Sequence, residues 1–466
     1  MTYRADPVAL SLGDGFFDPV DAANFPETIL RYRNDRAAKD VGLDHLSEDE
    51  WISHFARFTP LADNLPQPMA QRYHGHQFRH YNSELGDGRG FLFAQMRDGD
   101  GRLIDLTTKG SGTTPYSRRG DGRLTLKGGV REIMATEMLE AIGVNTSKTL
   151  SIIETGEKLI RGDEPSPTRS AVMVRQCHGS IRIGTFQRHA YFRDHERLEK
   201  LIDYAMEQFF GGKADGDLAE RALAFLDKVV TTTANNAADL MAAGFVHGVL
   251  NSDNINITGE IFDFGPWRFL PTMDLMFTAA YFDETGLYSF GRQAEAIHWD
   301  VYQLGGCLVE LSSEEAVREV LKPWGDRYSE ALRQRLLRRL GLKSTSLEAD
   351  EALLMAINDF LVATKAPYEQ FFFDWYGGPF AKYRAEASPI ADLYTHATAV
   401  PLKALLDQAA PISDAAGTHS YFSGKPCTML YDEVEDIWAA IADRDDWSKL
   451  DKKLQEIAVM RDALAV

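Results

Sequence analysis

The sequence predicts an α+β fold with a small β-rich lobe followed by a larger helical lobe. Three observations support it: strand-like runs at 90–96 and 103–109, a helix-like run at 130–142, and long amphipathic stretches from about residue 195 onward. We therefore expect four regions: an N-terminal extension at 1–60, the β-rich lobe at 61–190, the helical lobe at 191–380 and a helical C-terminal segment at 381–466.

Each element has a local signal. The turn Asp98-Gly99-Asp100-Gly101 separates the first two strand-like runs and predicts a hairpin. Apolar residues near a 3.6-residue period predict the helix at 130–142, and Gly143 suits its C-terminal end. Further predictions are strands at 149–154 and 171–176 around a loop at 161–167, helices at 198–210 and 218–241, and a partly helical N-terminal extension.

The composition indicates a globular protein. The chain has 466 residues, of which 44% are hydrophobic and 11% aromatic, enough for large cores. Its net charge of −19 argues against nonspecific nucleic-acid binding, which depends on neutralising phosphates. The three cysteines form no CxxC pair, no run of eighteen apolar residues occurs, and the N-terminus does not resemble a signal peptide. We expect a reducing, cytoplasmic compartment and no association with membranes or nucleic acid.

Four side chains follow one another in the order of a protein-kinase signature. They are Lys109 in a strand-like run, Glu132 in a helix-like run, Asn254 in a loop and Asp263 in an Asp-Phe-Gly motif. One part is missing: the kinase base aspartate lies five residues before the asparagine, where this chain has Val249. The order predicts a protein-kinase-like bilobal fold that keeps the nucleotide machinery and changes the chemistry.

Two further segments are candidates for phosphate binding. The loop Gly86-Asp87-Gly88-Arg89 stands before a strand-like run that precedes Lys109. The backbone N–H groups of this loop can approach an anion closely, although a tight turn explains the glycines as well. Residues 110–123 are the densest glycine and arginine segment, in which Asp121 is a candidate partner for ribose or adenine. The alternative is a flexible surface loop.

Several cations need anionic partners. Arg175 ends an apolar run and should point into a cleft, with Arg182 seven residues later, so each needs a phosphate or a structural carboxylate. A phosphate site or a solvated basic face would explain a basic run within fourteen residues: Arg118, Arg119, Arg123, Lys127 and Arg131.

Asn254 and Asp263 are candidate metal ligands, because magnesium takes hard oxygen atoms from few protein groups plus phosphate. We expect residues 255–262 to form a short hairpin that brings both ligands to one edge. Asp253 is then available as a general base, or it orients the loop. Structural rather than catalytic or metal-binding roles are expected for His247, His74, His76 and His80.

Six segments form a larger pattern: 73–78, 85–89, 109–123, 131–132, 181–186 and 247–266. Together they resemble the selenoprotein O (SelO) family of pseudokinase-like protein adenylyltransferases, over roughly residues 65–310. Residues 387–430 do not look like that family's usual asparagine-rich C-terminal segment.

The resemblance implies a kinase-like fold that binds ATP in reversed orientation, with the γ-phosphate buried and the α-phosphate presented to the acceptor. AMP would be transferred to a Ser, Thr or Tyr hydroxyl, and pyrophosphate would leave. It also implies that Asp253 is the base, that Glu132 positions Lys109 on the phosphates, and that Asn254 and Asp263 bind metal. The residues implied to line the nucleotide are Gly86, Gly88, Arg89, Lys109, Asp121, Gly122, Arg175, Arg182 and Asp263.

We therefore expect a protein adenylyltransferase that uses Mg²⁺ (or Mn²⁺), with ATP and acceptor proteins as its partners. Three alternatives stay open: UMP transfer with manganese, γ-phosphoryl transfer by a kinase with Asp253 as a displaced base, and a catalytically silent nucleotide-binding scaffold. Retention of Lys109, Glu132, Asn254 and Asp263 speaks against the silent scaffold.

Overall fold

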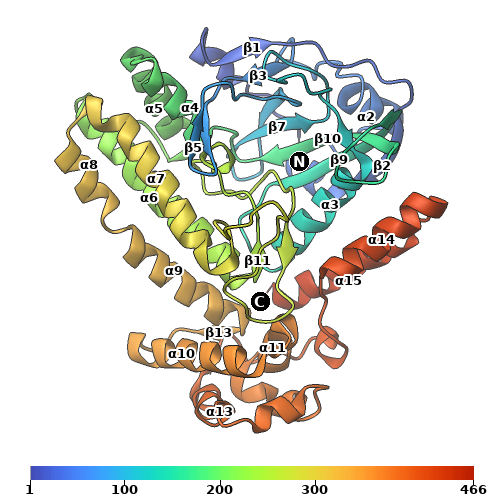
Figure 1. The fold of residues 1–466 in the computed structure, drawn as a ribbon, viewed down its shortest axis with the longest axis vertical. Coiled ribbons are helices and arrows are strands. Elements are labelled where there is room, and N and C mark those ends of the chain that lie inside the picture. The colour runs from blue at the N-terminus through green and yellow to red at the C-terminus, as the bar shows by residue number, and fades with distance from the viewer. Residues whose placement is uncertain (1, 466) are drawn as a thin grey trace.

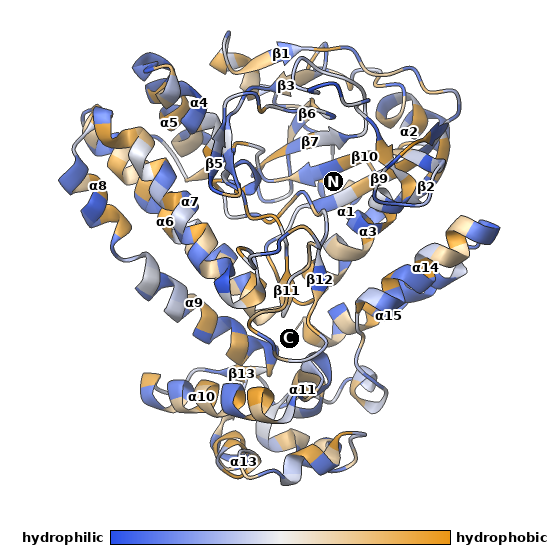
Figure 2. Cartoon of the chain, viewed as in Figure 1, coloured by the Kyte–Doolittle hydropathy of each residue, from blue (hydrophilic) through white to orange (hydrophobic). Residues whose placement is uncertain are grey.

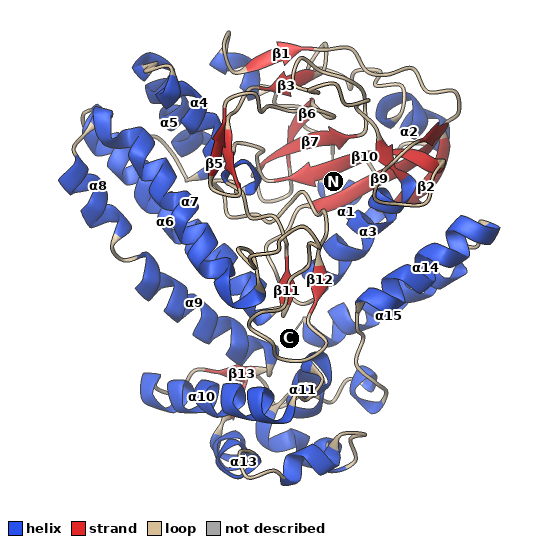
Figure 3. Ribbon diagram, in the orientation of Figure 1, coloured by secondary structure: helices blue, strands red, loops and turns tan. Residues whose placement is uncertain are grey.

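A computed structural model describes residues 2–465 and confirms the mixed α and β content (Figure 1). Strands gather in the N-terminal part, and helices make up most of the chain after residue 182 (Figure 3). No helix among the described residues is long and apolar enough to cross a membrane.

One curled antiparallel sheet organises the N-terminal part, in the order β1-β3-β6-β7-β10-β9-β2, with β8 pairing with β10. Its strands are β1 (Phe17–Pro19), β2 (Ile29–Arg33), β3 (Met69–Gln71), β6 (Leu92–Arg97), β7 (Leu103–Lys109), β8 (Leu124–Thr125), β9 (Lys148–Leu159) and β10 (Thr168–Cys177). Three strand pairs lie outside it: β4 (Gly75–Gln77) with β5 (His80–Asn82), β11 (Phe245–Val246) with β12 (Arg268–Phe269), and β13 (Leu342–Lys343) with β14 (Ala410–Pro411).

The predicted strands are present. β6 and β7 form the expected hairpin, closed by the Gly101 N–H donating to the Asp98 carbonyl at 3.1 Å. β9 and β10 pair antiparallel and are longer than the predicted runs. Their outer ends, such as Glu157 and Lys158, are polar and partly exposed because this hairpin extends beyond the core, so an apolar run marks only its buried half.

The helices are α1 (Asp35–Asp40), α2 (Glu48–Phe55), α3 (Leu126–Ala141), α4 (Ile183–Tyr191), α5 (His195–Phe209), α6 (Leu218–Ala242), α7 (Gln293–Leu308), α8 (Glu314–Leu321), α9 (Trp324–Arg339), α10 (Leu347–Thr364), α11 (Tyr368–Trp375), α12 (Lys382–Glu386), α13 (Ala399–Gln408), α14 (Tyr431–Arg444) and α15 (Ser448–Leu464). α5 and α6 match the predicted helices closely, and Figure 2 shows hydrophobic and hydrophilic residues alternating along α6 and α7. α3 starts four residues before the predicted 130, because the Thr125 side chain caps it by accepting from the Gly128 N–H.

Two apolar layers sandwich the sheet. α3 covers one face, with Ile133 and Met134 in the same core as Ile152 and Met173. Trp51 and Phe55 of α2 help cover the other face, packed with Phe91 and Phe93. The sheet therefore fixes where α3 lies, and with it Glu132.

The two ends of the chain both return to the sheet. Residues 1–60 supply β1 and β2, the strands at either end of the sheet order. The C-terminal segment first packs below the helical part and then sends α14 and α15 back alongside α3 (Figure 1). The expected boundaries at residues 60, 190 and 380 stay predictions.

Candidate functional site

A cavity of about 770 Å³ collects the candidate residues from distant parts of the chain. It is lined by every predicted nucleotide and metal residue: Gly86, Gly88, Arg89, Lys109, Asp121, Gly122, Arg175, Arg182, Asp253, Asn254 and Asp263. Of the predicted site residues, only Glu132 lies outside the lining, and it contacts the cavity through Lys109. The sequence therefore identified a set of residues that share one place in the fold.

The lining of this cavity is strongly cationic. Eight cationic side chains face four anionic ones: Arg89, Lys109, Arg118, Arg119, Arg123, Arg161, Arg175 and Arg182 against Asp87, Asp121, Asp253 and Asp263. The chain as a whole carries −19. A local excess of positive charge in such an acidic protein suits a polyanionic ligand such as a nucleoside triphosphate.

Lys109 lies at the centre of the site. It ends β7, and its ammonium is 2.6 Å from Glu132 Oε1 on α3 and 2.7 Å from Asp263 Oδ1. The predicted lysine–glutamate ion pair is therefore present, with both side chains buried. Burial alone would raise the pKa of Asp263, but the charges of Lys109, Arg175 and Arg182 outweigh it and hold that pKa well below its ordinary value.

Arg175 and Arg182 are buried in the cavity wall with incomplete partners. Arg175 lies 3.4 Å from Asp263, and Arg182 lies 3.4 Å from Asp87 and donates to the Asp253 carbonyl at 2.9 Å. The Nε atoms of both arginines have no hydrogen-bond partner within residues 2–465. Buried guanidinium groups with donors left over can bind an additional anion.

The loop around Asn254 sits at the cavity edge next to Asp263. Asn254 donates from Nδ2 to the Val249 carbonyl at 3.0 Å, which leaves its Oδ1 available as a ligand. Burial raises the pKa of Asp253 to about 6, with the charge of Asp263 adding to the effect and Arg182 opposing it. Both carboxyl groups and the amide line the same cavity, so one ligand can reach all three.

The glycines of the site are required by close contacts. A Cβ at Gly86 would lie 2.3 Å from the Tyr116 ring, and Gly122 has φ +67° with the Gly112 carbonyl oxygen 2.2 Å from such an atom. Any side chain at either position would displace the loops that line the cavity. The loop before β6 and the segment at 110–123 are therefore packed against each other, which explains the glycines of both.

The structure divides the basic run. Its first three arginines line the cavity, whereas Lys127 pairs with Glu435 at 2.7 Å and Arg131 donates to the Trp267 carbonyl at 2.8 Å. Sequence reasoning missed Arg161, which lines the cavity and holds Asp121 at 2.7 Å. Nothing in its local sequence distinguishes Arg161 from an ordinary loop residue.

The predicted hairpin at 255–262 is wrong. Its first half pairs with residues 181–183, through the Ile183 N–H to the Ile255 carbonyl at 3.0 Å, and its second half pairs with residues 145–147. The two halves find partners on other segments because those already lie beside them in the fold. The segment still brings Asn254 and Asp263 to one cavity.

Glu260, within this segment, predicts an effect of pH on stability. It is buried, accepts from the His178 N–H at 2.9 Å, and burial raises its pKa from 4.5 to about 7. As pH rises, Glu260 loses its proton in the unfolded chain before it does so in the folded protein. The free energy of unfolding therefore falls as pH rises from 4.5 to about 7. We expect Glu260→Gln to raise the free energy of unfolding by about 3 kcal/mol at pH 8 and by little below pH 4.5, measured by urea unfolding.

The exposed Glu284→Gln is the matched control and should change stability at neither pH. A Glu260→Gln protein that is less stable than the wild type at pH 8 would contradict the conclusion that the ionised Glu260 carboxylate destabilises the fold.

The histidines are mostly packed and hydrogen-bonded, as predicted. His74 contacts the Tyr81 hydroxyl at 2.8 Å, His76 contacts Gln187 at 2.7 Å, and His247 contacts the Phe262 carbonyl at 3.0 Å. His80 differs, because it is exposed. The contact of His247 with the residue before Asp263 fits the structural role expected for it.

Comparisons with known proteins agree over most of the chain. A family model described as "Protein adenylyltransferase SelO" matches residues 1–458, well beyond the 65–310 that carry the resemblance and including 387–430. The protein nucleotidyltransferase YdiU of Synechocystis sp. is 39% identical, with 98% of each chain covered. The proteins of the same name from Gloeobacter violaceus (41% identical, 95% of this chain and 92% of the relative) and Synechococcus elongatus (44% identical, 84% and 77%) are similar too.

Proposed function

This chain belongs to the SelO family of protein adenylyltransferases, and we propose that it transfers AMP from ATP to Ser, Thr or Tyr hydroxyls of acceptor proteins. The observation that carries the proposal is the cationic cavity in which Lys109, Arg175 and Arg182 surround Asp263. These cations can neutralise the charge of three phosphates, and Lys109 pairs with a helix glutamate as the phosphate-binding lysine of protein kinases does.

We also propose that the two parts of the fold act as the lobes of a protein kinase. The sheet with α3 corresponds to the small lobe, and the helices α5 to α11 correspond to the large one, with the C-terminal segment outside both. The support is the shared order of a strand lysine, a helix glutamate, an asparagine loop and an Asp-Phe-Gly motif around one cavity.

Asn254 and Asp263 are the proposed ligands of Mg²⁺ (or Mn²⁺). Their amide and carboxylate oxygens are hard donors of the kind these ions take, and both line the cavity. A cation bound there would neutralise phosphate charge and stabilise the leaving pyrophosphate.

The proposed reaction is a single displacement. An acceptor hydroxyl oxygen forms a bond to the α-phosphorus, and the bond from that phosphorus to the oxygen bridging to the β-phosphate breaks. Asp253, whose pKa of about 6 leaves most of it ionised at neutral pH, takes the hydroxyl proton. Lys109 and the arginines hold the phosphates, and Glu132 holds Lys109 in place. The absence of a carboxylate at Val249 fits attack at a phosphate other than γ.

Isotopic labelling tests the proposal. The protein is incubated with Mg²⁺ or Mn²⁺, unfolded casein as a source of hydroxyls, and ATP labelled on either the α- or the γ-phosphate. We expect label on protein from α-labelled ATP only, because AMP retains the α-phosphate.

The same assay separates the rival functions. Retention of the γ-label alone would overturn the proposal in favour of a kinase. UTP labelled on the α-phosphate measures UMP transfer, and stronger labelling by UTP than by ATP would favour uridylylation.

A further inference from the structure

The last two helices of the chain lie along α3, the helix that carries Glu132. Apolar residues of α14 and α15, among them Val434, Ile437 and Met460, belong to the same core as Val130 and Ile133 of α3. Figure 1 shows α14 and α15 running back from the helical part to the side of the sheet on which α3 lies. No described residue of α14 or α15 lines the 770 Å³ cavity, so these helices can act on the reaction only indirectly, and α3 is the element of the site whose core they share.

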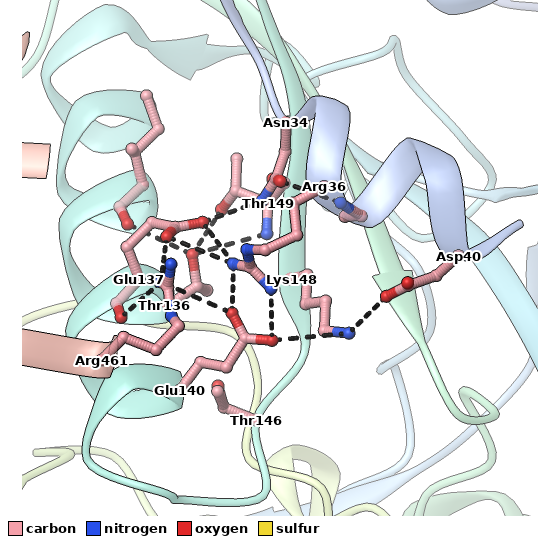
Figure 4. A network of polar contacts seen from close by, with 12 residues as sticks. Asn34, Arg36, Asp40, Thr136, Glu137, Glu140, Thr146, Lys148, Thr149 and Arg461 are labelled. Atoms are coloured by element: carbon pink, nitrogen blue, oxygen red, sulfur yellow. Dashed lines mark hydrogen bonds and ion pairs between the residues drawn. The ribbon is translucent and has the colours of Figure 1, made fainter. Parts of the chain in front are cut away.

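One anchor lies near the C-terminal end of α3. Glu137 is buried and accepts hydrogen bonds from Tyr32 at 3.1 Å and Asn34 at 2.8 Å, and it pairs with Arg36 and with Arg461 of α15 (Figure 4). The Arg461 guanidinium also lies 3.7 Å from Glu140. A carboxylate with four donors around it fixes this end of the helix firmly.

The second anchor lies at the start of α3. Lys127, in the first turn, pairs with Glu435 of α14 at 2.7 Å. Lys127 lies five residues before Glu132, and Glu137 lies five residues after it. Glu132, which holds Lys109, therefore lies midway between two residues of α3 that each form an ion pair with the C-terminal helices.

We propose that Arg461 and Glu435 are positioning residues, which hold α3 so that Glu132 stays on Lys109. The proposal rests on the proposed adenylyl transfer for its kinetic test. The Glu132–Lys109 contact is 2.6 Å, and a shift of α3 of about 1 Å would break it and release Lys109 from its place on the phosphates. The C-terminal segment thereby acquires a role in the chemistry, although none of its residues up to 465 lines the cavity.

The test compares Arg461→Ala, Glu435→Ala and the double variant in transfer from α-labelled ATP to casein. We expect kcat to fall about tenfold, about threefold and at least about twentyfold, with a smaller change in KM for ATP. Arg461→Lys should recover part of the loss, because a lysine keeps the charge but cannot span Glu137 and Glu140. Hydrogen exchange of the α3 amides should accelerate in the double variant.

Lys449→Ala is the matched control. It removes an ion pair of 2.6 Å with Asp436 between α14 and α15 themselves, and α3 supplies no partner of that pair, so kcat and α3 exchange should stay at wild-type values. Assays are run well below the unfolding temperature of every variant.

Wild-type kcat and wild-type α3 exchange in a folded double variant would overturn the proposal, and so would an equal loss in Lys449→Ala. A wild-type protein that transfers no label would refute the proposed function instead. Hydrogen exchange would then decide on the anchors alone: faster α3 exchange supports them, and unchanged exchange overturns them.

Discussion

Asp263→Asn is expected to lower the rate of AMP transfer by about three orders of magnitude while the protein stays folded. The amide keeps the size of the side chain and tolerates the left-handed backbone at this position, where φ is +63°. It carries no charge, so it can neither neutralise Lys109, 2.7 Å away, nor serve as a strong ligand for a divalent cation. The measurement is kcat with α-labelled ATP at saturating Mg²⁺.

The same variant should bind metal-free ATP more tightly than the wild type. Removing a carboxylate leaves Lys109, Arg175 and Arg182 without their shared counter-charge, which strengthens attraction for the phosphates. ATP affinity measured in the presence of EDTA should rise severalfold, in the direction opposite to the transfer rate.

The exposed Glu284→Gln serves as the control that loses one carboxylate away from the cavity. Transfer at more than a tenth of the wild-type rate in Asp263→Asn would refute the metal assignment.

The site was more predictable than the fold around it. Lys109, Glu132, Asn254 and Asp263 carry chemistry that only a few residue types supply, so their order along the chain was enough to predict that they meet: three line one cavity, and Glu132 pairs with Lys109 behind it. The start of α3 was missed because Gly128 and Gly129 add no apolar side chain to the 3.6-residue period. In the structure, Gly129 lets the helix pack closely on Ile152 of β9.

Long-range partners could not be predicted. The strands β1 and β2 are short and partly exposed, and their pairing depends on sheet edges provided by residues far along the chain. The ion pairs of α3 with the C-terminal helices span 308 and 324 residues. No local pattern distinguishes Glu435 or Arg461 from other charged residues on amphipathic helices.

Lys109→Met is expected to reduce both transfer and stability. Loss of the ammonium removes a positive charge that would neutralise the phosphates, and it should lower kcat/KM by about two to three orders of magnitude. It also removes the partner of the Glu132 carboxylate, which is buried with only 1% of the residue exposed. The Oε2 atom of Glu132 already lacks a hydrogen bond among the described residues. An unpaired buried charge of this kind costs about 3 kcal/mol, which urea unfolding at pH 7.5 would measure.

Adding Glu132→Gln to Lys109→Met separates the two effects. The double variant has no unpaired charge at position 132, so it should recover most of the lost stability, and the four proteins of the cycle should show a strong coupling free energy. Transfer should not recover, because no cation returns to the phosphates. Additive stability losses would show that the 2.6 Å contact between Lys109 and Glu132 does not contribute to the free energy of unfolding. Recovered transfer would show that Lys109 acts only by neutralising the charge of Glu132. If both expectations hold, the Lys109 ammonium serves the fold and the chemistry in different ways. It neutralises the buried Glu132 carboxylate, and Glu132 in turn holds it in one place for the phosphates.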